Sequence, residues 1–106
     1  MAFDVTTHAE DGVLTVRLTG ELDSRAAHRF NEVIGAVPGG TVNRLVLHLA
    51  ELVYLSSAGL RCLVFAQQKL GRGTEIVLVG TRPEVAETIT MTGFDRSVTM
   101  QDPVDS

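Results

Sequence analysis

The side chains that could carry chemistry in this chain are few, and the most conspicuous are two adjacent serines, Ser56 and Ser57. A serine hydroxyl acts as a nucleophile only when a base and an orienting acid contact it. His48 is the candidate base, but spacing alone gives this pairing little support, and the sequence contains no G-x-S-x-G pattern. The support for a hydrolase is therefore weak, and we expect the protein not to be an enzyme.

Metal and cofactor chemistry has even less support. The three histidines, His8, His28 and His48, fall on different predicted elements and lack ligand spacing such as H-x-x-x-H. The glycines of residues 71–73 form no phosphate-binding loop, because the third glycine of that motif is missing and a strand follows them. We expect no metal and no cofactor.

Composition narrows the classes further. A chain of 106 residues, 44% hydrophobic and 21% charged, suits one globular domain over residues 1–106, with 101–106 as a frayed tail. The net charge of −4 and the scattered basic residues argue against direct nucleic-acid binding. A single cysteine, no signal-peptide pattern and no long apolar stretch indicate a cytoplasmic domain without membrane contact.

The first half of the chain predicts a hairpin followed by a helix. Residues 3–7 and 13–19 alternate apolar and polar side chains about an Asp11-Gly12 turn, which is typical of two antiparallel strands. Residues 20–23 are interpreted as a loop, with Asp23 or Ser24 capping the next helix. Residues 38–40 end this helix. Its apolar stripe recurs at spacings of three and four and consists of Ala27, Phe30, Val33, Ile34 and Val37.

The second half predicts alternating strands and helices. Residues 45–49 place apolar side chains on both faces of the predicted strand, which favours a strand covered on both faces. A helix follows the serine pair, a second buried strand spans residues 76–79, and Pro83 opens a third helix with Val85, Ile89 and Thr92 inward. A short strand over residues 97–100 completes the order β-β-α-β-α-β-α-β. This order predicts an α/β domain with a mixed sheet.

Two segments together carry a family resemblance. Residues 18–23 read L-T-G-E-L-D, and residues 52–63 read L-V-Y-L-S-S-A-G-L-R-C-L. At this separation they resemble the STAS-domain anti-sigma factor antagonists. The resemblance continues through Gly73, residues 76–80 and residues 91–94, so it covers nearly the whole chain.

This resemblance implies a STAS-like fold and a partner switch. In that family, the antagonist binds an anti-sigma factor that is also a serine kinase, and a sigma factor is released. The kinase then phosphorylates a serine just before the second family helix, the complex dissociates, and a metal-dependent serine phosphatase resets the switch.

Matched position by position, the phosphoacceptor falls on Ser57, with Ser56 as the alternative. Ser56 stands where many relatives have aspartate, and Ala58 where many have serine or threonine. Asp23 matches an aspartate near the partner-binding face. The expected partner-binding residues are Asp23, Ser56, Ser57, Ala58, Gly59, Leu60, Arg61 and Phe65.

Several of these residues have a structural interpretation as well. From pattern alone, Ser57 is an N-cap for the helix that follows it. Gly59 either lets a kinase approach or permits close backbone packing. The apolar shoulder of Cys62, Phe65 and Ala66 indicates either a partner surface or a wide core stripe under a neighbouring helix.

An alternative function keeps the fold and removes the switch. The chain would then be an unmodified STAS scaffold subunit in a lipid-transport or signalling assembly. Ser56 and Ala58, which depart from the usual residues, keep this alternative open.

Overall fold

The computed structural model describes residues 3–38, 40–71 and 73–101. They form one five-stranded sheet in the order β1-β2-β3-β4-β5, in which β1 is antiparallel to β2 and the remaining neighbours are parallel. The predicted mixed sheet and element order are confirmed. The elements in chain order are β1 (Asp4–Glu10), β2 (Val13–Leu22), α1 (Ser24–Gly35), β3 (Arg44–Leu55), α2 (Ser57–Leu70), β4 (Glu75–Val79), α3 (Pro83–Thr92), a 3-10 helix (Phe94–Ser97) and β5 (Thr99–Gln101).

The predicted hairpin turn is present between β1 and β2. Asp11 and Gly12 have φ angles of 51° and 79°. Positive φ at two successive central residues is the conformation that two-residue hairpins favour. The carbonyl oxygen of Gly12 also accepts hydrogen bonds from the backbone N–H groups of Asn43 (2.7 Å) and Arg44 (3.2 Å). The hairpin is thereby joined to the start of β3.

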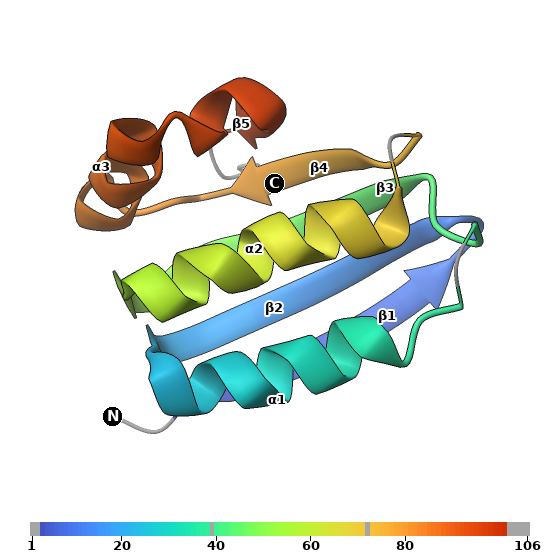
Figure 1. Cartoon of the computed structure of the whole chain (residues 1–106), viewed down its shortest axis with the longest axis horizontal. Coiled ribbons are helices and arrows are strands. Elements are labelled where there is room, and N and C mark those ends of the chain that lie inside the picture. Colours follow the sequence, from blue (N-terminus) through green and yellow to red (C-terminus); the bar gives the residue numbers. More distant parts are fainter. Residues whose placement is uncertain (1–2, 39, 72, 102–106) are drawn as a thin grey trace.

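Helices α1 and α2 lie side by side over one face of the sheet (Figure 1). On β2 the alternate residues Leu14, Val16 and Leu18 are buried against them, as expected for a strand with one covered face. Phe30 and Ile34 of α1 are completely buried in the same core. The third helix contacts β3 and the 3-10 helix, and the 3-10 helix contacts β5, so both lie toward the β5 edge of the sheet (Figure 1).

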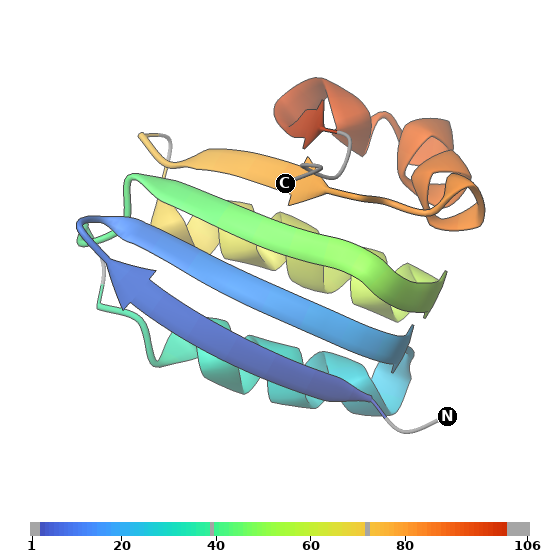
Figure 2. The same cartoon turned by 180° about the vertical axis from the view of Figure 1, so that it is seen from behind.

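The opposite face of β1, β2 and β3 carries no helix from the described part of the chain (Figure 2). Val46 and His48, which alternate with the buried leucines of β3, are only half-buried. The prediction that residues 45–49 are covered on both faces is therefore wrong. Partial burial and the nearby charge of Arg17 lower the pKa of His48.

Strands β2 and β3 are longer than predicted. Residues 20–22 belong to β2, so only Asp23 remains of the predicted loop. Their register shifts twice, because β3 contains one extra residue between the pairs Arg17–His48 and Thr19–Glu51 and another before Glu21–Tyr54. Both strands consequently extend directly to the first residues of α1 and α2.

Smaller differences concern the ends of elements. Helix α1 ends at Gly35 with Ala36 as its C-cap, before the predicted stop. Thr92 is exposed, so its predicted inward position is wrong. Strand β5 begins at Thr99 because residues 94–97 form the 3-10 helix. Gln101 belongs to β5, and the rest of the predicted tail lies outside the described residues.

Candidate functional site

The candidate site lies where β2 and β3 end and α1 and α2 begin. Parallel strands followed by helices bring both helix N-termini to the same edge of the sheet. Asp23 caps α1, since its Oδ1 accepts hydrogen bonds from the N–H groups of Arg25 (3.1 Å) and Ala26 (3.0 Å). The prediction that either Asp23 or Ser24 caps this helix is thus settled in favour of Asp23.

Ser56, not Ser57, caps α2. Its Oγ accepts a hydrogen bond from the N–H of Gly59 (3.0 Å) and donates one to the carbonyl oxygen of Leu22 (3.0 Å). The backbone N–H of Ser56 donates to the same carbonyl (3.1 Å). Leu22 directly precedes the α1 cap, so its carbonyl ties the start of α2 to the start of α1. The interpretation of Ser57 as the N-cap is wrong.

Ser57 is the first residue of α2 and is exposed. Within the described ranges its hydroxyl forms no hydrogen bond, whereas the Ser56 hydroxyl both donates and accepts one. Phosphorylation of Ser56 would remove its donor proton and break its hydrogen bond with Leu22. Of the two serines, Ser57 is the one that can be modified without loss of a structural contact.

This division of roles predicts different stabilities for two alanine variants. Ser56→Ala should lower the free energy of unfolding by about 1–2 kcal/mol, because it removes an N-cap. Ser57→Ala should change it by less than about 0.5 kcal/mol, as for exposed substitutions. Urea unfolding of both variants beside wild type checks this, and equal losses would contradict the assignment of Ser56 as the cap.

The other predicted residues separate into buried and accessible groups. Gly59 and Leu60 are buried, so they shape the site from below. A Cβ on Gly59 would lie 2.5 Å from the carbonyl oxygen of Leu22, which is direct evidence of close backbone packing. Ala58 is half-buried, and Arg61 is exposed one turn beyond Ser57.

A groove of about 360 Å³ runs between α1 and α2, beginning close to the serine pair. Cys62 lies in its floor, where its Sγ contacts the carbonyl oxygens of Ala27 and Ala58, and burial raises the pKa of this thiol. Phe65 is 40% exposed on the groove. The groove is lined by Ser24, Ala27, His28 and Asn31 of α1 and by Ala58, Arg61, Cys62 and Phe65 of α2.

Burial along the groove decides whether each of Cys62, Phe65 and Ala66 belongs to a partner surface or to the core stripe of α2. Cys62 and Ala66 are buried, so they belong to the core stripe beneath the neighbouring helix. Phe65 alone of the three remains exposed. Sequence reasoning missed the α1 side of the groove, including Asn31, whose buried Oδ1 has no hydrogen-bond partner. Its only sequence signal was a polar residue beside the α1 stripe.

The structure separates the serine pair from His48, the candidate base for a serine nucleophile. His48 lies in the middle of β3, and the buried Leu47 and Leu49 on either side of it face the helices. Its side chain therefore points to the opposite face. Leu55 follows His48 by seven positions along β3, a distance of roughly 20 Å. Within the described residues, no cluster of three or more histidine, cysteine, aspartate or glutamate side chains could hold a metal ion.

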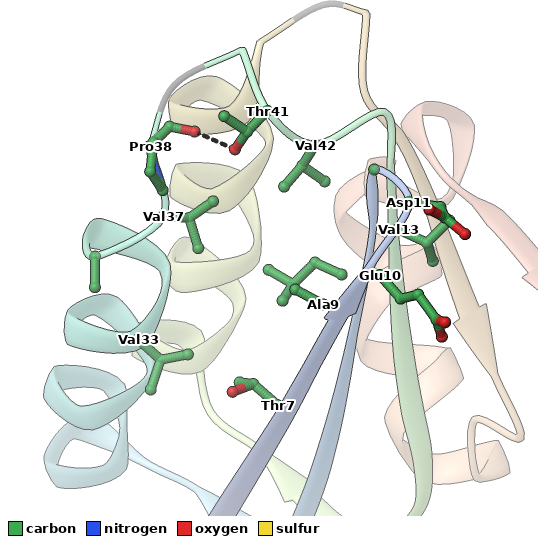
Figure 3. A pocket seen from close by; sticks show the side chains of 13 residues that line it. Thr7, Ala9, Glu10, Asp11, Val13, Val33, Val37, Pro38, Thr41 and Val42 are labelled. Atoms are coloured by element: carbon green, nitrogen blue, oxygen red, sulfur yellow. Dashed lines mark hydrogen bonds between the residues drawn. The ribbon is translucent and has the colours of Figure 1, made fainter.

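A second hollow, of about 450 Å³, lies at the other end of α1 (Figure 3). Val33, Val37 and Val42 face it, together with Thr7 and Ala9 of β1 (Figure 3). Thr41 donates a hydrogen bond to the carbonyl oxygen of Pro38 across its rim (2.7 Å). The Glu10 and Asp11 carboxylates point away from this space (Figure 3). Its lining therefore offers no nucleophile–base pair.

The described residues form an α/β fold in which α1 and α2 begin at one edge of the sheet, and comparison with known proteins identifies its family. The STAS domain family model matches residues 4–106, and the chain belongs to this family. None of the helices in the described part of the chain is long and apolar enough to cross a membrane.

Three relatives illustrate the similarity. The anti-sigma-F factor antagonist RsfB of Mycobacterium tuberculosis is 28% identical over 93 residues, which are 88% of this chain and 76% of RsfB. BtrV of Bordetella bronchiseptica is 34% identical over 85 residues, 79% of this chain and 73% of BtrV. The crystal structure of an anti-sigma factor antagonist from Mycobacterium paratuberculosis superposes with a TM-score of 0.80 at 30% identity, covering 94% of this chain and 86% of that one.

Proposed function

We propose that this chain is an anti-sigma factor antagonist that phosphorylation of Ser57 switches off. The unmodified chain binds an anti-sigma factor with serine kinase activity, and the sigma factor is released. The kinase transfers the γ-phosphoryl group of ATP to Ser57 Oγ, which loses its proton, and ADP is formed. A serine phosphatase returns the hydroxyl by hydrolysis.

The observation that carries this proposal is the exposed and uncommitted hydroxyl of Ser57. It stands beside a serine whose own hydroxyl is fully engaged in capping. A kinase needs a hydroxyl that can leave its surroundings and align with the γ-phosphoryl group. The similarity to proteins named as anti-sigma factor antagonists adds the class of partner.

The effect of phosphate follows from its charge. Phosphoserine adds about −1.5 to −2 charges at neutral pH. At a helix N-terminus this charge is favourable by roughly 0.3–1 kcal/mol, so the fold survives. In an interface where the partner presents no cation, the same charge loses its water at a cost of several kcal/mol. Each ~1.4 kcal/mol is tenfold in affinity, so the complex dissociates while the domain stays folded.

We assign the partner surface to the serine pair and the adjoining groove. Asp23 and Arg61 supply charges of opposite sign on its edges, and Phe65 supplies an exposed apolar side chain. Aromatic residues that are accessible in a hollow are typical anchors of protein interfaces. Ser56, Ala58, Gly59 and Leu60 hold this surface in place rather than forming its energetic centre.

The deciding experiment is a pull-down from the native cell with wild type and Ser57→Ala side by side, followed by phosphopeptide mapping after addition of ATP. We expect both baits to bind the anti-sigma kinase and ATP to release the kinase from the wild-type bait alone. The phosphate should be found on Ser57. Phosphate on Ser56 or a distant residue would overturn the site. Retention of the kinase on both baits after ATP, with no phosphate incorporated, would favour the unmodified scaffold.

A further inference from the structure

We propose that Arg61 is the internal ion-pair partner of a phosphate on Ser57, donating hydrogen bonds to its oxygens, and that this ion pair forms part of the switch. The inference rests on the proposed phosphorylation and concerns what the modified chain does next. Ser57 is the first residue of α2, and Arg61 follows it by four positions on the same helix. Side chains at this spacing are neighbours, with Cβ atoms about 5–6 Å apart.

Arg61 has no competing anion in the part of the chain that the structure describes. It is exposed and takes part in none of the ion pairs, whose cationic members are His8, Arg29, Arg44 and Arg82. The first turn of α2 contains no acidic residue, and neither does the first turn of α1. The Asp23 carboxylate, on the adjacent helix start, accepts hydrogen bonds from two N–H groups of α1.

The chemistry of the two groups is well matched. A guanidinium presents parallel N–H donors that bind two phosphate oxygens at once, and charge-assisted hydrogen bonds of this kind are the stronger ones. The order is also the favourable one, since an anion that precedes a cation by four residues agrees with the helix dipole. Phosphorylation therefore creates the anion that this turn of the helix lacks.

The pair gives phosphorylation a second effect on the partner surface. In the unmodified chain, Arg61 lines the groove between α1 and α2, where a partner can reach its guanidinium. Once Ser57 carries phosphate, the guanidinium turns toward the helix start. The groove then loses its cation at the moment when the interface gains negative charge.

The test uses the full chain with phosphoserine installed at position 57 during synthesis, so that it does not depend on any kinase. The second pKa of the phosphate is measured by ³¹P NMR titration at low salt. In wild type, the guanidinium should stabilise the dianion, and Arg61→Gln should raise that pKa by about 0.2–0.4 units. The difference should shrink at high ionic strength because the pair is exposed.

Two further variants make the result specific. Arg17→Gln removes the same charge from the uncovered sheet face and should leave the phosphate pKa at the wild-type value. Arg61→Lys keeps the charge without the planar fork and should give an intermediate pKa. Identical titrations of wild type and Arg61→Gln would overturn the pair, whatever the kinase modifies. Failure of the phosphorylation site itself would appear separately, in the phosphopeptide map.

Discussion

Ser57→Asp should weaken binding to the anti-sigma kinase by about ten- to a hundredfold and leave the fold intact. The aspartate carboxylate carries one charge where phosphate carries up to two, so it reproduces part of the desolvation cost in the interface. At the first position of α2 the same charge suits the helix dipole. Calorimetric titration against the purified kinase measures the affinity, and thermal melts measure the stability.

Matched variants separate this effect from simple changes of charge. Ser57→Ala should bind like wild type and resist release by ATP, since no hydroxyl remains at that position. Ser97→Asp is the control for charge, because it adds the same charge far from Ser57. Ser97 is located by Gln67 of α2, which donates a hydrogen bond to the Ser97 carbonyl. Gln67 is ten residues along α2 from Ser57, a distance of about 15 Å. Wild-type affinity in both Ser57 variants would place the switch elsewhere and bring the scaffold alternative forward.

The sequence placed the candidate site at the serine pair but did not separate the roles of the two serines. Both serines are good N-cap residues, and a pattern cannot tell which of two neighbours has non-helical backbone angles. That choice depends on the Leu22 carbonyl, 34 residues away from Ser56, which takes both the N–H and the hydroxyl of Ser56. Ser56 can take the place of the aspartate that the family resemblance implies at this position, because both side chains can cap a helix.

The fold was predictable as far as local periodicity reaches. Alternating strands, helical stripes and the Asp11-Gly12 turn each depend on neighbouring residues, and these elements were predicted correctly. The lengths of β2 and β3 were not, because a glycine at position 20 favours a loop and because the exposed Ala50 and Glu51 interrupt the alternation of β3. These residues remain in strands because the two strands pair across register shifts, which a single strand's pattern does not reveal.

Gly59→Ala should destabilise the domain by about 1–3 kcal/mol, the usual cost of forcing an extra carbon into a tightly packed site. The new Cβ would lie 2.5 Å from the Leu22 carbonyl oxygen, 2.8 Å from Leu22 Cγ and 2.9 Å from Leu55 Cδ1. The leucine side chains could rotate, but the carbonyl is backbone at the end of β2. It also holds Ser56, so any movement that relieves the contact weakens the cap of α2.

Gly35→Ala is the control, because Gly35 is also helical and an added Cβ there meets no atom within 4 Å. Alanine is a better helix former than glycine by up to about 1 kcal/mol, so this variant should equal or exceed wild type in stability. If urea unfolding shows a lower free energy of unfolding for Gly59→Ala and an equal or higher one for Gly35→Ala, the loss at position 59 is due to packing. Because the start of α2 must shift to admit the methyl group, Gly59→Ala should also weaken partner binding under conditions where it remains folded. A Gly59→Ala variant as stable as wild type would show that the contact between α2 and the end of β2 is looser than the structure indicates.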